Sequence, residues 1–344
     1  MYSFYLGLDL HLKKTYAVLL DTQGETIDEW HIANEELPTY LHEAVPPKTY
    51  AVLEATRNWP FLYDLLVEHV ERVELAHPKE LKAISSAAVK TDRIDARVLA
   101  QLARLNYLPI AYAAPATTRD LRLLTRHRSQ LVWARTRAKN RIHALLAMYN
   151  LSAPVTDLFG VRGREVLEQE LCSQLRPAAR NVLGNHLGLL DHINEQIAVT
   201  EAAIELTPEQ KQAVHLLTTI PGVGKTIAHT IVAEIGEIRR FHSPKALCNW
   251  AGLTPRVRQS AAITYHGPIS KQGSPHLRAA MTQAATIASR FSKRWYGVHE
   301  RLARRCSKQA AKVAVARRLL TVVYYMLERN EPYQENYQRK HRGA

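Results

Sequence analysis

The chain has 344 residues, 46% hydrophobic and 23% charged, which is an ordinary composition for a globular protein of two or three domains. No apolar run reaches the roughly 18 residues of a membrane span, and Met1 leads into YSFYLGLDL without the basic segment or cleavage site of a secretory leader. The three cysteines, Cys172, Cys248 and Cys306, are too widely spaced for a disulfide framework or a zinc site. We therefore expect a cytoplasmic protein without a membrane partner.

The net charge of +14 is unevenly distributed along the chain. Residues 1–105 contain 11 Lys and Arg against 16 Asp and Glu, whereas residues 106–344 contain 35 against 16. An acidic N-terminal part followed by a strongly basic remainder indicates a carboxylate site that is presented to a polyanion. The alternative is a generically basic soluble protein.

Alternating strands and helices are predicted for the first hundred residues. Apolar patterns predict strands over 4–9, 15–21, 25–32, 49–55 and 73–77, and helices over 36–44, 58–70 and 88–105. Three strands followed by alternating helices and strands are typical of a ribonuclease-H-like α/β domain, which we place at residues 1–108.

Four carboxylates occupy special positions in this predicted domain. Asp9 and Glu54 end the first and fourth strands, which are neighbours in such a sheet, and Asp92 and Asp95 share the first turn of the last helix. Their repulsion would raise their pKa values unless a cation lay between them, and oxygen ligands of this kind select Mg²⁺ or Mn²⁺. Two ions about 4 Å apart would serve phosphoryl transfer. For a lone D-x-x-D, the alternative is a helix cap beside a solvated carboxylate.

A basic helical domain is predicted over residues 117–205, after a linker at 106–116 that contains two prolines. A long helix from Thr117 carries an apolar seam close to a 3,4 repeat, formed by Leu121, Leu124, Leu131, Ala138, Ile142 and Leu145. A loop at 150–165 and helices over 164–176 and 178–205 follow. The last of these helices would complete either an antiparallel hairpin or a coiled coil in a dimer.

Basic side chains cover the other faces of the long helix. They are Arg119, Arg122, Arg126, Arg128, Arg135, Arg137, Lys139 and Arg141. Acidic residues are almost absent from this helix, so pairing between successive turns cannot explain the basic stripe. The pattern favours contact with nucleic-acid phosphates over a merely solvated face.

A helix–hairpin–helix is predicted at residues 216–236, LLTTIPGVGKTIAHTIVAEIG, in the third domain at 206–332. Gly222 and Gly224 would let the backbone approach a phosphate, and the amides near Lys225 and Thr226 would hold it without reading sequence. A phosphate-binding P-loop is excluded, because no G-x-x-x-x-G-K and no preceding strand occur. A purely structural hairpin is the alternative.

The segment from Pro255 to Leu277 is polar, basic and rich in Gly and Pro, and we predict a loop. Ser260 lies there with four basic or titratable neighbours, Arg256, Arg258, His266 and Lys271. A hydroxyl among cations is a candidate nucleophile toward phosphorus. From spacing alone, however, an ordinary loop serine is the favoured alternative, and Ser270 and Ser274 qualify equally. Amphipathic helices over 275–290, 298–305 and 308–329 and a basic tail at 333–344 complete the chain.

These motifs together resemble transposases of the insertion-sequence 110 family over nearly the whole chain. Asp9 in YLGLD, Glu54 in VLEAT, and Asp92 and Asp95 in KTDRIDARVLA look like the family's DEDD set, in a domain that resembles the RuvC Holliday-junction resolvase. The segments IPGVGKTIAHTIVAEIG, WAGLTPR and GPISKQGSPHLR are similar to the family's second transposase domain.

The resemblance implies a recombinase that excises and inserts its own element. A structured non-coding guide RNA, the bridge RNA, would pair with donor and target DNA. Ser260 would form a covalent phosphoserine link, and the four carboxylates would act with Mg²⁺ at the same composite site in a dimer of dimers. Arg256, Arg258 and Lys271 would stabilise the phosphate, with Arg278 among the nucleic-acid contacts.

One departure from the family pattern follows the serine. The family usually has glycine there, whereas this chain has Ala261-Ala262, and the register is fixed by Ile269-Ser270-Lys271 downstream. The resemblance also implies a prokaryotic, nucleoid-associated protein. Two rival functions stay open: a metal-dependent junction nuclease without a covalent serine intermediate, and an inactive relative that only binds nucleic acid.

Overall fold

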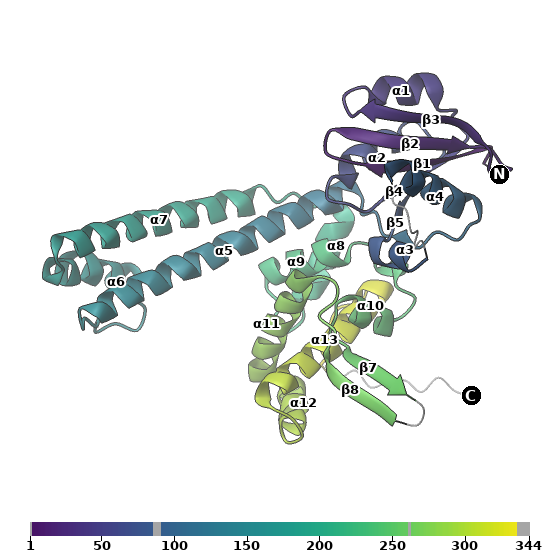
Figure 1. Ribbon diagram of the computed structural model, residues 1–344. Coiled ribbons are helices and arrows are strands. Elements are labelled where there is room, and N and C mark those ends of the chain that lie inside the picture. The colour runs from purple at the N-terminus through teal and green to yellow at the C-terminus, as the bar shows by residue number, and fades with distance from the viewer. Residues whose placement is uncertain (1, 85–90, 261–262, 336–344) are drawn as a thin grey trace, which may run out of the picture. The chain divides into compact units, whose positions relative to one another are not determined.

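The computed structural model describes residues 2–84, 91–260 and 263–335, without the side chains of residues 258–260, 263, 264 and 266. The chain forms two compact units, Met1–Ala114 and Pro115–Ala344 (Figure 1). The second unit holds the helical and C-terminal parts together, across the predicted boundary between residues 205 and 206. Within the described residues, no helix is both long enough and apolar enough to cross a membrane.

The first unit is built on a six-stranded sheet in the order β3-β2-β1-β4-β5-β6. The strands are β1 (Phe4–Leu10), β2 (Lys14–Leu20), β3 (Thr26–Ala33), β4 (Thr49–Glu54), β5 (Arg72–Ala76) and β6 (Ile110–Ala111). Strands β1, β4 and β5 run parallel, whereas β2, β3 and β6 run antiparallel to their neighbours. The five predicted strands are confirmed, and β6 lies in the segment that we expected to be a linker.

Helices cover both faces of this sheet. They are α1 (Leu37–Ala44), α2 (Trp59–Val67), α3 (Pro78–Ile84) and α4 (Asp92–Arg104). Leu37 of α1 and Leu62 of α2 join Leu6 and Leu8 in one buried cluster. Ala96 and its neighbours on α4 pack on the opposite face with Val18 and Leu20 of β2. The mixed α/β prediction is confirmed, and this arrangement is consistent with a ribonuclease-H-like fold.

Gly7 allows α4 to lie close against β1. A Cβ atom at Gly7 would lie 2.7 Å from the amide nitrogen of Ala100 and closer still to the carbonyl oxygen of Ala96. Backbone atoms cannot move aside as a flexible side chain can, so only glycine fits this crossing. The crossing brings the start of α4 toward the carboxyl end of β1.

The second unit begins with an antiparallel pair of long helices, α5 (Ala116–Met148) and α7 (Pro177–Ala202) (Figure 1). Arg128 pairs with Glu201, whereas Arg135 further along α5 donates to Asn194, which lies earlier on α7. The short helix α6 (Val161–Glu165), a π-helical stretch at Val166–Leu171 and a 3₁₀ turn at Cys172–Gln174 connect the two helices. Of the two predicted arrangements, the structure contains the antiparallel hairpin.

The rest of the second unit is mainly helical. Its elements are α8 (Pro208–Thr218), α9 (Lys225–Ile235), a 3₁₀ turn (Ile238–Arg240), α10 (Pro244–Trp250), β7 (Pro255–Ser260), β8 (Ile263–Ile269), α11 (Pro275–Phe291), α12 (Lys293–Ala303) and α13 (Lys308–Arg329). Their shared core includes Ile231, Leu247, Met281, Trp295 and Leu319.

Two predictions in this region are wrong. The predicted loop from Pro255 contains an antiparallel hairpin, β7 and β8, whose first pair joins Pro255 to Ile269. The penultimate helix begins at Lys293 instead of residue 298, because the Ser292 hydroxyl caps it by accepting from the amide of Trp295 at 3.2 Å.

Candidate active site

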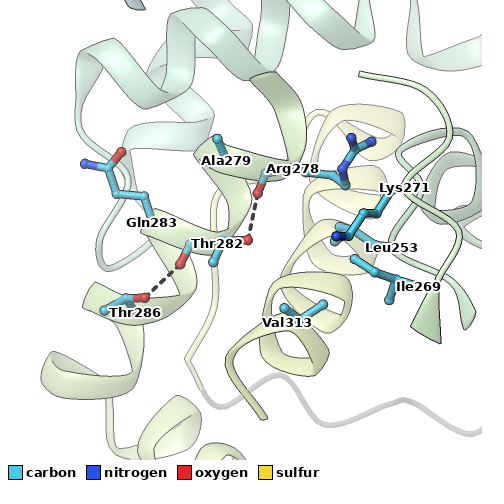
Figure 2. Close-up of a pocket in the computed structure, with 9 residues that line it drawn as sticks. All are labelled: Leu253, Ile269, Lys271, Arg278, Ala279, Thr282, Gln283, Thr286 and Val313. Atoms are coloured by element: carbon cyan, nitrogen blue, oxygen red, sulfur yellow. Dashed lines mark hydrogen bonds between the residues drawn. The ribbon is translucent and has the colours of Figure 1, made fainter. Parts of the chain in front are cut away.

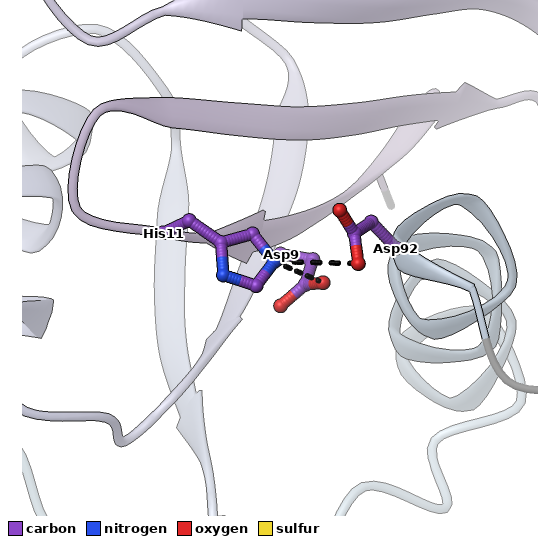
Figure 3. Close-up of side chains that lie close together, drawn as sticks. All are labelled: Asp9, His11 and Asp92. Carbon is purple, nitrogen blue, oxygen red and sulfur yellow. Dashed lines mark ion pairs between the residues drawn. The ribbon is translucent and has the colours of Figure 1, made fainter.

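Two of the four predicted carboxylates come together at the carboxyl end of β1. Asp9 is the penultimate residue of β1, and Asp92 is the first residue of α4, whose start is capped by the Thr91 hydroxyl accepting from the amide of Ile94 at 3.3 Å. His11 lies between them (Figure 3). Its Nε2 is 3.3 Å from Asp9 Oδ2 and 3.3 Å from Asp92 Oδ1.

Electrostatics at this cluster favour a bound cation. Burial raises the pKa of Asp9, the nearby histidine opposes that rise, and the charges of Asp92 and Asp95 add to it. One potential ligand atom from each of Asp9, His11 and Asp92 lies within 4.8 Å of the other two. A divalent cation would turn the repulsion between the carboxylates into attraction, so the residues present fit such an ion.

The other two predicted carboxylates lie nearby in the same unit. Strands β1 and β4 are paired through Leu8 and Leu53, so Asp9 and Glu54 follow at corresponding positions of adjacent parallel strands. Among the described residues, the cluster of ligand atoms within 4.8 Å does not include Glu54 or Asp95. Asp95 nevertheless acts on Asp9 through its charge.

His11 was absent from our sequence-based site. The only sequence signal for it is its position two residues after Asp9, in the polar break between two strands. That break is fixed in space: the side-chain amide of Asn34 donates to the carbonyl oxygens of His11 and Leu12, at 3.0 and 3.1 Å, and Asn58 donates to that of His11 at 3.1 Å.

The candidate nucleophile lies in the second unit. Ser260 is the last residue of β7 and pairs with Ile263 in backbone register. The side chains of Ser260, Arg258 and His266 lie outside the described part of the structure, as do residues 261–262. The nucleophile therefore stays a prediction.

Lys271 and Arg278, which we also predicted to bind phosphate, line a cavity of about 440 Å³ near this hairpin (Figure 2). Arg278 Nη1 donates to the carbonyl oxygens of Ala251, Gln272 and Gly273 at 3.1–3.2 Å. Arg256 donates to the carbonyl oxygen of Ser270 at 3.2 Å. Arg278 thus joins the two chain segments that flank the hairpin, and Arg256 joins β7 to the residue that follows β8.

The two glycines of the turn between α8 and α9, Gly222 and Gly224, have different roles. Gly222 has φ +90°, and a Cβ there would lie 2.8 Å from the carbonyl oxygen of Ala284, so Gly222 packs the turn on α11. Gly224 precedes α9 with open space around its missing Cβ. A groove of about 710 Å³ is lined by this turn, Thr226, Arg128 and Arg135.

Several arginines of the predicted basic stripe have acidic or carbonyl partners from other helices. Arg126 forms a two-pronged ion pair with the buried Glu234 of α9, at 2.7 and 2.9 Å, and Arg122 donates to the carbonyl oxygen of Ala233. Arg126 and Arg128 thus have acidic partners, Glu234 and Glu201, on helices other than α5, which an argument about pairing within the helix does not address. Those partners are distant in sequence.

The remaining members of the stripe differ in exposure. Arg137 and Arg141 are exposed. The Lys139 ammonium lies 4.6 Å from the ring centroid of Phe159. The two exposed arginines are thus the members of the stripe best placed to contact a polyanion.

Two stretches of the chain match models of known transposases. Residues 6–151 match the DEDD transposase model of the IS110 family, and residues 214–300 match the model described as Transposase IS116/IS110/IS902 family. The chain is 28% identical to the pilin gene-inverting protein of Moraxella lacunata over 97% of this chain and 98% of the relative. It is 26% identical to the transposase for insertion sequence element IS1111A of Coxiella burnetii over 76% and 72%.

Both matches follow the order in which the two parts occur in the chain. The DEDD match includes the strand end and the helix start that bring Asp9 and Asp92 together, and such a domain, with its acidic cluster, suggests use of a divalent metal. The second match includes the α8–α9 turn and the β7–β8 hairpin. The chain is thus a DNA-recombining enzyme, a transposase that belongs to the IS110/IS116/IS902 family.

Proposed function

We propose that this transposase excises and inserts its own element by serine-mediated recombination, guided by a structured non-coding RNA and assisted by a metal–carboxylate site. The observation that carries the proposal is the meeting of Asp9 and Asp92 at the carboxyl end of β1, inside a DEDD transposase domain. A protein that only binds nucleic acid has no use for a pocket whose acidic side chains repel its ligand.

The carboxylates Asp9, Glu54, Asp92 and Asp95 would hold Mg²⁺ or Mn²⁺. The bound cation would supply positive charge to polarise the scissile phosphate. The protein's own part is to fix the carboxylates: Gly7 allows α4 to approach β1, and Thr91 caps the turn that carries two of the aspartates.

Ser260 is proposed as the nucleophile. Its Oγ would attack the phosphorus, forming a phosphoserine bond as the bond to a deoxyribose oxygen breaks; the serine proton is lost and the leaving oxygen gains a proton. Arg256, Arg258 and Lys271 would stabilise the added negative charge on the phosphate.

Nucleic acid would bind to the basic second unit. The α5 arginines and the turn at Gly222–Thr226 would contact phosphates of RNA and DNA. We further propose a dimer of dimers, in which the carboxylates and Ser260 act at one composite site.

The test uses the full chain expressed together with its flanking element DNA. Sequencing of copurified RNA is expected to give one discrete species from the element's non-coding flank. With the donor and target DNA that this RNA identifies, wild-type protein should form a covalent DNA adduct and recombinants. Ser260→Ala should abolish both, whereas the matched control Ser270→Ala should retain the adduct.

Other outcomes would favour a rival. Cleavage by Ser260→Ala with free 5′ phosphates and no adduct would indicate a junction nuclease. Unchanged recombination by Asp9→Asn would refute the metal–carboxylate part. Copurification of only heterogeneous cellular RNA would refute the proposal that a specific RNA guides the reaction.

A second candidate function is inversion of a DNA segment. It is favoured by the similarity to the Moraxella lacunata protein, whose name states that it inverts a pilin gene and which matches over nearly the full length of both chains. A substrate carrying two sites in inverted orientation would distinguish the functions, since inversion reverses the orientation of the intervening DNA without releasing a circle.

A further inference from the structure

His11 is placed as a ligand atom would be at the carboxylate site. Its Nε2 is equidistant, at 3.3 Å, from one oxygen of Asp9 and one of Asp92. Ligand atoms about 2.1 Å from one ion lie about 3–4 Å apart, so the distance from Nε2 to each of the two oxygens fits the ligand set of a single cation. Neither the DEDD pattern nor a metal–carboxylate mechanism requires a histidine here.

The backbone of His11 is held from three elements. Asn34, directly after β3, and Asn58, directly before α2, both donate to its carbonyl oxygen, and its amide donates to the carbonyl oxygen of Lys14 at 3.0 Å. Asn34 is itself oriented by the hydroxyl of Thr15 in β2, at 2.8 Å. These hydrogen bonds fix the backbone position from which the imidazole extends toward Asp9 and Asp92.

We propose that His11 is a nitrogen ligand of the metal, together with Asp9 and Asp92, and that it makes the site prefer Mn²⁺ to Mg²⁺. Mg²⁺ is bound almost entirely by oxygen, whereas Mn²⁺, which shares that preference for oxygen, is a transition-metal ion that also accepts an imidazole nitrogen, and the later divalent metals bind imidazole more tightly still. This inference rests on the proposed metal–carboxylate function and adds the identity of a ligand and of the preferred ion.

The rival explanation is that His11 only donates a hydrogen bond to the carboxylates and must leave when a cation arrives. The two explanations predict opposite changes in Mn²⁺ affinity when His11 is replaced. A ligand strengthens Mn²⁺ binding, so its removal lowers the affinity. A competing donor weakens metal binding, so its removal leaves the affinity unchanged or raises it.

The experiment titrates the full chain with Mn²⁺ at mildly alkaline pH and follows free Mn²⁺ by its electron paramagnetic resonance signal, with Mg²⁺ as competitor. His11→Asn is expected to lower the Mn²⁺ affinity at least about tenfold and the Mg²⁺ affinity much less. The control His42→Asn changes an exposed histidine at the end of α1 and should bind both ions as the wild type does.

Pulsed electron paramagnetic resonance of the wild-type Mn²⁺ complex gives an independent result without any variant. Coupling to an imidazole nitrogen is expected, and it should disappear in His11→Asn and persist in His42→Asn. Mn²⁺ that depends on Asp9 but shows no nitrogen coupling would overturn the proposal for His11 and leave the carboxylate site intact. Unchanged Mn²⁺ binding by Asp9→Asn would instead refute the carboxylate site itself.

Discussion

Gly7 shows how a residue without any functional side chain determines the site. We predict that Gly7→Ala destabilises the first unit by about 1–3 kcal/mol or more, because the new methyl group collides with the backbone of α4 at Ala96 and Ala100. Helix α4 carries Asp92, so Mn²⁺ affinity should fall together with stability. Chemical denaturation and metal titration measure the two effects.

A matched control for this change is Gly184→Ala. Gly184 lies within α7, and a Cβ there would meet no atom within 4 Å, so this variant should be at least as stable as the wild type. If Gly7→Ala were equally harmless, the close crossing of α4 and β1 would not be what places Asp92.

The Arg126–Glu234 pair yields a prediction with a definite pH dependence. Burial alone would raise the pKa of Glu234, but its hydrogen bonds and ion pair with Arg126 outweigh burial and hold the pKa below the ordinary 4.5. A carboxyl group with a lowered pKa in the folded state stabilises the fold above its unfolded value, and this contribution is lost as the pH falls through the folded value.

Arg126→Ala should therefore cost about 2–3 kcal/mol near pH 7, at the lower end for a buried pair because Arg126 is partly exposed. The loss should shrink on acidification, since protonation removes the unpaired buried charge. Urea denaturation of both proteins near pH 7 and near pH 4 measures the difference. An equal deficit at both pH values would mean that Arg126 acts through packing alone.

At the scale of elements, the cap of α4 links helix stability to the site. Thr91→Ala removes the hydroxyl that accepts from the amide of Ile94 and should cost about 1 kcal/mol. Thr91→Ser keeps the hydroxyl and should cost much less. Because the capped turn carries both Asp92 and Asp95, the alanine variant should also bind Mn²⁺ more weakly, and equal affinity in all three proteins would separate the cap from the site.

Elements with a clear local pattern were predictable from the sequence. Alternating or helical apolar spacing located the strands β1 to β5 and the long helices, since burial of one face leaves a period in the chain. The β7–β8 hairpin was not predictable in this way, because Pro255, Gly267 and Pro268 are typical of loops.

Only those candidate site residues that lie at the end of a strand or the start of a helix could be predicted from the sequence. Asp9 and Asp92, which the structure brings together, could be predicted because such positions follow from the predicted fold. His11 and the partners of Arg126 were missed, because each depends on a contact between distant segments: a turn folded against α4 in one case, and α9 against α5 in the other. No local pattern records such contacts.

At the scale of the whole molecule, the two units have separate hydrophobic cores, so we expect metal binding to stabilise one unit without the other. Leu6 and its cluster stabilise the first unit, whereas Met281 and its cluster stabilise the second. Calorimetry should show two unfolding transitions, one for each unit. Mn²⁺ should stabilise only Met1–Ala114, raising its free energy of unfolding by about 2.7 kcal/mol when the free Mn²⁺ concentration is 100 times the dissociation constant. Asp9→Asn should abolish this rise, and equal shifts of both transitions would place the metal elsewhere.

The length of α5 sets a scale for any nucleic acid that lies along it. Its 33 residues, at about 1.5 Å each, span about 50 Å, which is the length of about 15 base pairs of a duplex. The helix is held against α7 by packing, by the Arg128–Glu201 ion pair and by the Arg135–Asn194 hydrogen bond, so its length is constant. A duplex that lay along α5 would contact it over about one and a half turns of the double helix. Inserting seven residues into each of α5 and α7 would lengthen this contact by about three base pairs.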